Sequence, residues 1–266
     1  MTGRSDGVVR DPSRELPGES ARQGAVDGNR PALSDLGAHR WGLHRQCRRH
    51  RSPTSDPCAE LVDDIDPVLV SGHLAWSTHQ GAYLNDLLPL PYDDETLQLV
   101  STHLHQVQDA LRRPYLVENP SSYVGFGQST MTEVEFLAEL VQRTSCRLLC
   151  DVSNVFLSGH NMGFDPYLYI DAFPAQAIGE VHLGGFAPEA DEATPGAEIL
   201  IDTHGTVIAE PVWQLYAHAL RRFGATPTLI EWDNDIPPLA TLLAEAERGN
   251  AAADAALRKG PHALTG

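Results

Sequence analysis

Basic residues are scarce in this sequence, which has 19 lysines and arginines against 36 aspartates and glutamates in 266 residues and a formal net charge of -17. Binding to a nucleic-acid backbone needs clustered basic side chains that release the counterions of the phosphates. The basic residues are also unevenly spread, because residues 1–60 hold ten arginines, whereas residues 61–266 hold nine basic and 28 acidic residues. The acidic balance therefore argues against a nucleic-acid partner.

Long apolar runs and paired cysteines are also missing. No apolar run approaches the roughly 20 residues that cross a bilayer, and the N-terminus lacks the apolar middle region of a secretory signal. The sequence therefore predicts a cytoplasmic protein with no membrane partner. The four cysteines lack zinc-ribbon spacing and are interpreted as reduced thiols. They are Cys47, Cys58, Cys146 and Cys150.

The composition and the hydrophobic pattern of the sequence change near residue 59. Residues 1–58 are rich in Arg, Gly, Ser and Pro without a sustained apolar period, so we expect an aberrant or disordered segment there. Residues 59–250 alternate short apolar runs with longer amphipathic stretches, which is typical of βα repetition in a single barrel domain. Residues 251–266 are expected to form a flexible C-terminal tail.

Six strands and five helices are predicted in the barrel segment. The strands are expected at Val68–His73, Tyr115–Glu118, Arg147–Val152, Ile178–Leu183, Glu198–Asp202 and Pro227–Glu231. The helices are expected at Asp94–Leu111, Glu133–Arg143, Pro166–Phe173, Pro211–Phe223 and Pro237–Arg248. Six βα units amount to most of an eight-fold TIM (β/α) barrel of the α/β class, namely strands three to eight.

Each predicted strand ends in or next to a side chain that can bind a metal ion. These residues are His73, Glu118, Asp151, His182, Asp202 with His204, and Glu231. The ends of parallel barrel strands converge, and a buried carboxylate or imidazole is costly unless it is paired or bound to a cation. Carboxylate and imidazole donors without thiolate suit iron, manganese or zinc. Several bridging carboxylates would favour more than one ion.

Each of these residues could also have a purely structural role in place of metal binding. His73 alone is more typical of a core histidine, and Glu118 and Asp151 are equally compatible with caps of turns or helices. His182 and the pair of Asp202 and His204 are the stronger signals, because an Asp-x-His step at a strand end directs two ligand types to one place.

Four further polar residues are candidates for an additional ligand or a substrate contact. Asn154, His160 and Asn161 are expected in a long loop after a barrel strand, where barrel enzymes carry substrate-binding groups. Asp233 is expected to cap the following helix or to support the ligands.

Eight segments together resemble the family of multinuclear non-haem iron enzymes typified by MbnB and TglH. They are SGHLAWS, YLNDLLPLPY, VENPSSY, LLCDVSNV, GFDPYLYIDAFP, GEVHLGGF, IDTHG and PTLIEWDNDIP, between about Leu61 and Glu247. Two departures from the family pattern are Ser153, where Asn is frequent, and Met162, where His is common.

The resemblance implies a xylose-isomerase-like TIM barrel that binds two or three irons. It also implies oxidation of cysteine in ribosomally made peptides by dioxygen, with a small partner protein that presents the precursor peptide. By motif it assigns His73, Glu118, Asp151, His182, Asp202, His204 and Glu231 as iron ligands, with Asn154 as a candidate additional ligand.

The resemblance also implies two earlier βα units, with EIHPENY-like and SLHGVG-like motifs that are absent from residues 1–60. The codons of residues 8–18 can be chosen so that a shifted reading frame gives WFEIHPENYL, and the frames would rejoin near Cys58. We therefore hypothesise compensating frameshifts in the gene or in its sequencing. If the frameshifts are present in the organism, the barrel lacks its first two strands, which leaves open sheet edges and too few ligands. In that case we expect the chain to fold poorly and to be largely inactive as translated.

Two other functions stay open from the sequence. The first is a divalent-metal isomerase or hydrolase on the same kind of barrel, which would work without dioxygen. The second is a non-catalytic truncated remnant, which would bind no metal.

Overall fold

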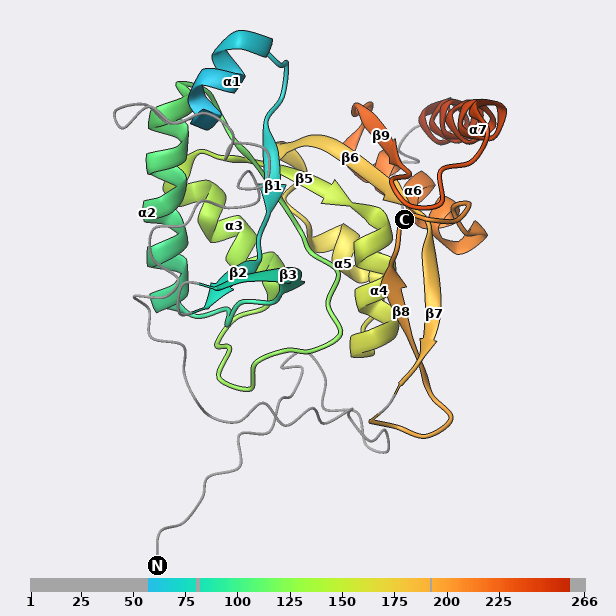
Figure 1. The fold of residues 1–266 in the computed structure, drawn as a ribbon, viewed down its shortest axis with the longest axis horizontal. Helices are drawn as coiled ribbons and strands as arrows, with labels where there is room; N and C mark the ends of the chain where they lie inside the picture. Colours follow the sequence, from blue (N-terminus) through green and yellow to red (C-terminus); the bar gives the residue numbers. More distant parts are fainter. Residues whose placement is uncertain (1–56, 80–81, 192, 259–266) are drawn as a thin grey trace, which may run out of the picture. The chain divides into compact units, whose positions relative to one another are not determined.

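The computed structural model describes residues 57–79, 82–191 and 193–258 of the chain. The helices are α1 (Pro57–Ile65), α2 (Asp94–Leu111), α3 (Glu133–Thr144), α4 (Val152–Met162), α5 (Pro166–Ala172), the short 3-10 helix η3 (Ala175–Ala177), α6 (Glu210–Phe223) and α7 (Leu239–Arg258). The strands are β1 (Ser71–His73), β2 (Trp76–His79), β3 (Ala82–Leu88), β4 (Leu116–Glu118), β5 (Arg147–Asp151), β6 (Ile178–Gly184), β7 (Phe186–Ala190), β8 (Glu198–Asp202) and β9 (Thr228–Glu231). Figure 1 shows these elements in chain order.

The chain divides into two compact units. The first unit ends at Pro120 and resumes at Val124–Leu148, and the second unit comprises Ser121–Tyr123 and the chain from Leu149 onward. Strand β5 begins in the first unit and ends in the second. Each unit is described separately below.

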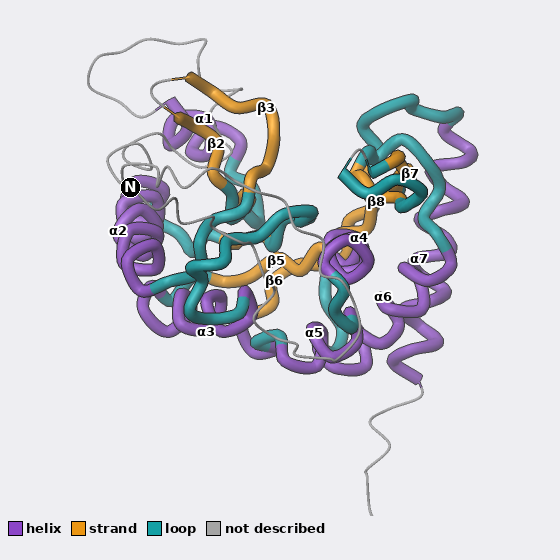
Figure 2. Tube along the Cα trace, turned by 90° about the horizontal axis from the view of Figure 1, so that it is seen from below, coloured by secondary structure: helices purple, strands orange, loops and turns teal. Residues whose placement is uncertain are grey.

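The first unit is built on the parallel pair of β1 and β4. His73 lies opposite Glu118 at the end of this pair, and Arg147 at the start of β5 donates its backbone N–H to the carbonyl of Tyr115 on the other side of β4. Helices α2 and α3 pack side by side, as Figures 1 and 2 show. Their apolar faces bury Leu97, Leu104 and Phe136 almost completely.

Helices α2 and α3 of the first unit begin at the residues that the sequence signals predicted, whereas α1 was not predicted. Asp93 caps α2 by accepting a hydrogen bond from the backbone N–H of Thr96 at 2.8 Å. Thr132 and Glu135 form a reciprocal capping box at the start of α3, which satisfies two backbone N–H groups that lack a helical partner. Both helix starts therefore follow from local side-chain chemistry.

The second unit is built on the strand order β5-β6-β9, in which β6 and β9 are parallel. Helices α4, α5 and α6 pack against one another, and α6 packs against α7. Figure 2 shows α5, α6 and α7 along the outside of this unit. Its core includes Leu149, Val181 and Leu183, which are fully buried, as is typical of parallel strands covered on both faces.

The remaining strands form two antiparallel hairpins, β2 with β3 and β7 with β8. The prediction that Glu198–Asp202 is a barrel strand is therefore wrong in its pairing, because β8 pairs with β7 and β6 pairs directly with β9. The reversal between β7 and β8 uses a turn at Thr194–Ala197 in which Gly196 has a φ of +85° and Ala197 donates to the Thr194 carbonyl. This is the positive φ that glycine adopts readily.

Two helix predictions are also corrected. Residues 152–162 form α4 and not a loop, although two valines, a glycine and several short polar residues give this segment a low helix propensity. Helix α7 continues to Arg258, so the predicted tail from residue 251 is wrong up to that residue. Residues 1–56 and 259–266, with the hypothesis of a frameshifted segment, lie outside the described residues.

Cys146 and Cys150 form no disulfide, as the sequence predicted, and both are buried. Cys58 is disulfide-bonded, so the interpretation of all four cysteines as reduced is wrong for this residue. Among the described helices, none combines the length and apolar content that a membrane span requires.

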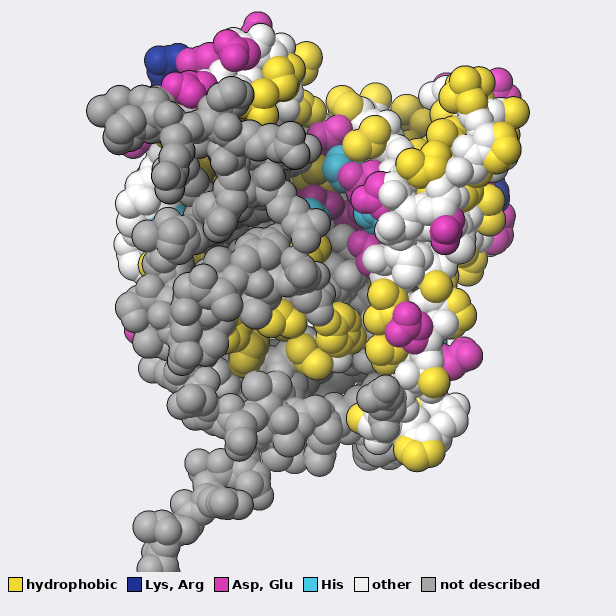
Figure 3. All heavy atoms as spheres, viewed as in Figure 1, with side chains coloured by type: hydrophobic (Ala, Val, Ile, Leu, Met, Phe, Trp, Pro, Cys, Tyr) yellow, Lys and Arg dark blue, Asp and Glu magenta, His cyan; other side chains and the backbone are white. Residues whose placement is uncertain are grey.

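An apolar surface lies over the C-terminal part of the second unit. Leu229 of β9 and Ile236, Leu239 and Leu243 nearby are all more than two-fifths exposed. Figure 3 shows hydrophobic side chains gathered on the surface around α7 and β9. Strand β9 is an edge strand of the described sheet, so its side chains have fewer neighbours there than in a closed barrel.

Candidate metal centre

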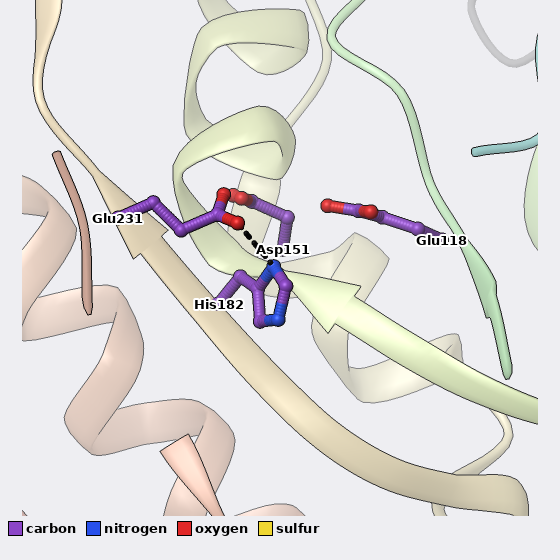
Figure 4. A group of neighbouring side chains, drawn as sticks. All are labelled: Glu118, Asp151, His182 and Glu231. Atoms are coloured by element: carbon purple, nitrogen blue, oxygen red, sulfur yellow. Dashed lines mark ion pairs between the residues drawn. The ribbon is translucent and has the colours of Figure 1, made fainter. Parts of the chain in front are cut away.

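The second unit gathers three of the predicted ligands at the ends of its parallel strands. Asp151 ends β5, His182 lies near the end of β6 and Glu231 ends β9. One ligand atom from each lies within 4.8 Å of the others. Figure 4 shows these three side chains directed toward one another, with the ion pair between His182 Nδ1 and Glu231 Oε1, which are 3.3 Å apart. Their geometry suits a metal ion placed among them.

Asp151 serves the fold and the site together. Its Oδ1 accepts a hydrogen bond of 2.7 Å from the backbone N–H of Asn154 and caps α4. The carboxylate is fully buried and lies at the positive end of this helix. Oδ2 is then the oxygen with which Asp151 would bind an ion. The two sequence interpretations, a helix cap and a ligand, are thus compatible in one side chain.

Asp202 and His204 extend the same group. Asp202 Oδ1 lies 2.8 Å from His204 Nε2, and His204 Nε2 lies 3.7 Å from Glu231 Oε2. His204 Nδ1 is 3.6 Å from Asp233, whose side chain is largely exposed. Nε2 of His204 therefore lies near the carboxylates of both Asp202 and Glu231, and Nδ1 on the other side of the ring lies near Asp233.

The backbone around His204 is held in an unusual conformation. His204 has a φ of +49°, its N–H donates to the Gly185 carbonyl at 2.8 Å, and its carbonyl accepts from the N–H groups of Asp233 and Asn234. A Cβ at Gly184 would lie 2.5 Å from the His204 ring, so the glycine leaves the space that the imidazole fills. The imidazole is therefore positioned by backbone contacts from two segments.

Burial alone would lower the pKa of His204. The hydrogen bond that His204 donates to Asp202, with the negative charges of Asp202, Glu231 and Asp151, outweighs burial and raises this pKa to about 9. These carboxylates thus keep His204 positively charged at neutral pH. A metal ion would supply the same neutralisation.

This pKa predicts that the metal-free protein loses stability as the pH rises. A histidine whose pKa is raised on folding stabilises the fold fully below its unfolded value of 6.5, and this stabilisation is lost as the pH rises through about 9. We expect the free energy of unfolding to fall by on the order of 3 kcal/mol over that window. Urea unfolding at several pH values measures it. The decrease should be absent from His204→Gln, and an equal decrease in that variant would contradict the assignment.

The first unit holds the two other predicted ligands. His73 Nε2 lies 3.4 Å from Glu118 Oε2, and the two residues are register partners at the ends of β1 and β4. Glu118 is buried and His73 is partly exposed. Glu118, which Figure 4 also labels, is thus paired with a histidine in its own unit.

Three of the additional candidates lie on α4. Asn154 follows the Asp151 cap and is buried, Asn161 bonds to the backbone of Leu200 through both atoms of its amide, and the exposed His160 lies 3.3 Å from the Glu198 carbonyl. The expectation of a loop at these positions is wrong, because the helix is capped by Asp151 and packed on β6 and β8.

Two residues at the site were missed from the sequence. Glu180 Oε1 lies 3.8 Å from His182 Nε2, and the two-residue spacing that puts both on one face of β6 was visible in the sequence. Ser153, noted only as a departure from the family pattern, is fully buried, and its Oγ bonds to both the N–H and the carbonyl of Gly184. No pattern within the sequence identified this contact.

Comparison with known proteins identifies the family. A family model described as "RiPP precursor modification enzyme MbnB/TglH/ChrH" matches residues 52–254. The chain belongs to this family. The resemblance found from the sequence motifs is thereby confirmed.

Curated relatives in the family carry the uninformative description "UPF0276 protein". One from Paraburkholderia phytofirmans is 49% identical over 187 residues, which cover 70% of this chain and 60% of that protein. One from Vibrio vulnificus is 49% identical over 191 residues, with 72% and 65% covered. The chain thus spans less than two thirds of the length of these relatives.

The solved structures confirm the predicted fold class. A xylose isomerase-like TIM barrel protein from Mycobacterium smegmatis, solved in complex with magnesium, is similar with a TM-score of 0.50 at 12% identity. The similarity covers 76% of this chain and 66% of that one. The fold is therefore a xylose-isomerase-like TIM barrel, and the matching family model describes enzymes.

Proposed function

We propose that this protein is a non-haem iron oxygenase that modifies cysteine residues of a ribosomally synthesised peptide. The observation that carries the proposal is the group formed by the buried Asp151 and His182 and the partly buried Glu231, in a member of a family described as acting on such precursors. A cluster of buried acids and imidazoles has little use in a folded core without a cation. The proposal therefore assigns the group to a metal.

Iron fits the donor set. The neighbouring donors are carboxylate oxygens and imidazole nitrogens, and Cys146 and Cys150 are buried core residues. Non-haem iron binds both imidazole nitrogens and carboxylate oxygens in proteins. The proposed iron ligands are His73, Glu118, Asp151, His182, Asp202, His204 and Glu231, with Asn154 as a further candidate, and they would hold two or three ions.

The chain's own residues would prepare the site for oxidation of a cysteine. Bound iron would supply one-electron redox chemistry. Dioxygen would be the oxidant and would accept the electrons and protons that leave the peptide. Asp202 orients the His204 ring, and Glu180 and Glu231 flank the two nitrogens of His182. These contacts fix the imidazoles in the orientation that ligation needs. A small partner protein that presents the precursor peptide completes the proposal.

The test is an assay on a cysteine-containing precursor peptide with its partner protein, using chain loaded anaerobically with ferrous iron. We expect a change in peptide mass, confined to cysteine, that requires both iron and dioxygen. His182→Ala should lose it, whereas Ser158→Ala, changed on α4 away from the ligands, should retain it. Turnover with manganese or zinc in the absence of dioxygen would instead indicate an isomerase or hydrolase, and iron-loaded chain without any peptide change would contradict the proposal.

A further inference from the structure

Strand β8 has one edge that faces away from its hairpin partner. Pro188 of β7 is the register partner of Leu200 of β8. Proline has no backbone N–H, so it fits an antiparallel pair at a position where the two facing residues are not hydrogen-bonded to each other. At such a position the N–H and carbonyl of the facing residue point away from the partner strand. The N–H and carbonyl of Leu200 consequently need partners outside the hairpin.

Asn161 of α4 supplies both partners. Its Nδ2 donates to the Leu200 carbonyl at 2.9 Å, and its Oδ1 accepts from the Leu200 N–H at 2.8 Å. Asn161 is 3% exposed, and both bonds are buried. An amide side chain carries the same donor and acceptor as a peptide group. Asn161 therefore occupies the place of a neighbouring strand on this edge of β8.

A second contact on the same edge agrees with this arrangement. His160 Nε2 lies 3.3 Å from the carbonyl of Glu198, two residues before Leu200. Alternate residues of a strand direct their backbone groups to the same side, so positions 198 and 200 share one edge. Figure 1 shows α4 alongside β8, and the two elements are in contact. The C-terminal half of α4 thus follows the edge of β8.

The same two elements carry metal-site residues. Asp151 caps the start of α4, and β8 ends at Asp202, two residues beyond the bond to Asn161. Asp202 in turn lies 2.8 Å from His204 Nε2. A displacement of β8 along or away from α4 would therefore move Asp202 and His204 relative to Asp151.

We propose that Asn161 is a positioning residue for the metal site, which holds Asp202, and through Asp202 the His204 ring, in place relative to Asp151 by bonding both backbone groups of Leu200. This inference rests on the proposed metal-binding function. Asn161 itself contributes no ligand atom, since both polar atoms of its side chain bond to β8. Residues that hold metal ligands in place typically contribute 10–100-fold to metal affinity.

The test is a double-mutant cycle of Asn161→Ala and Asp202→Ala, read by titration with Co²⁺, which accepts the same oxygen and nitrogen donors and absorbs visible light. We expect Asn161→Ala to weaken Co²⁺ binding about tenfold and to change its absorption spectrum. In the Asp202→Ala background the same substitution should weaken binding less than about twofold, because its effect passes through Asp202. Equal factors in both backgrounds would overturn the inference.

Ser158→Ala is the matched control on the same helix. It removes one buried hydrogen bond, from the Ser122 N–H, without touching β8. We expect Ser158→Ala to leave the Co²⁺ affinity and spectrum unchanged. Equal weakening by Ser158→Ala and Asn161→Ala would show a general loosening of α4 and overturn the inference.

A second measurement separates the contact from the metal. Amide hydrogen exchange at residues 198–202 should be faster in metal-free Asn161→Ala than in metal-free Ser158→Ala, and equal exchange would contradict the role of the contact. If Asn161→Ala does not fold, Asn161→Ser replaces it in the same cycle. Failure of the unchanged chain to bind Co²⁺ would contradict the proposed function and this inference together. Binding that Asn161→Ala leaves unchanged would overturn the inference alone.

Discussion

Replacing Asp151 with asparagine should weaken metal binding at least about 100-fold while leaving the stability of the metal-free protein almost unchanged. The Oδ1 of Asp151 caps α4, and an asparagine side chain caps a helix about as well as aspartate does. The negative charge beside His182 and Glu231 is lost, and with it the carboxylate oxygen that a metal would use. Titration with ferrous iron or Co²⁺ measures the first effect, and urea unfolding measures the second.

Asp151→Ala is the matched comparison, because it removes the cap as well as the charge. We expect it to lose metal binding to the same extent and to be about 1 kcal/mol less stable than Asp151→Asn. The two variants thereby separate the two roles of one side chain. Asp151→Asn with unchanged metal affinity would show that Asp151 is a cap and not a ligand.

Replacing Gly185 with alanine should destabilise the protein by about 3 kcal/mol, the largest stability effect that we predict for a single methyl group. The added Cβ would lie 1.9 Å from the backbone carbonyl oxygen of Thr206, so one of the two backbone segments must move. The carbonyl of Gly185 also accepts the N–H of His204, and the movement would reach the metal site. Urea unfolding and Co²⁺ titration should therefore both change.

Gly249→Ala provides the opposite case. Gly249 lies inside α7, and its added Cβ would meet Ile230 and Trp213 at 3.5 Å and beyond, which is ordinary contact. Alanine favours the helix over glycine, so we expect this variant to be more stable by about 0.5–1 kcal/mol. A destabilised Gly249→Ala together with a tolerated Gly185→Ala would contradict the packing described for both segments.

Helices and strands with local signals in the sequence, such as a capping residue or a regular apolar pattern, were predicted well. Helix α2 begins and ends where the sequence placed it, because Asp93 supplies a cap and the apolar residues recur at helical spacing. Strands β5 and β6 were placed within one residue of their observed ends, because buried parallel strands read as short apolar runs.

Other elements depend on contacts that the sequence does not display. Helix α4 has weak intrinsic propensity and forms because Asp151 caps it and because β6 and β8 pack on it. Strand β8 was found, but an apolar run does not reveal which strand it pairs with. The Thr194-Pro195-Gly196 sequence was a usable signal, since proline and glycine in succession favour the turn that joins an antiparallel hairpin.

The candidate site was predictable in its residue types and only partly in its geometry. Asp151, His182 and Glu231 gather in the second unit because parallel strand ends converge, which the strand assignments implied. Their roles as iron ligands remain predictions. The supporting contacts, such as Ser153 on Gly184 and Asn161 on Leu200, join residues more than 30 positions apart, and no local pattern indicates them.

The most direct test is the iron content of the folded chain. Protein loaded with ferrous iron under anaerobic conditions and then desalted is analysed for iron per chain, beside Asp151→Asn and His182→Ala treated alike. We expect the unchanged chain to retain iron in stoichiometric amount, and both variants, folded by circular dichroism, to lose most of it. A well-folded unchanged chain that retains no more iron than the variants would contradict a metal centre at these residues.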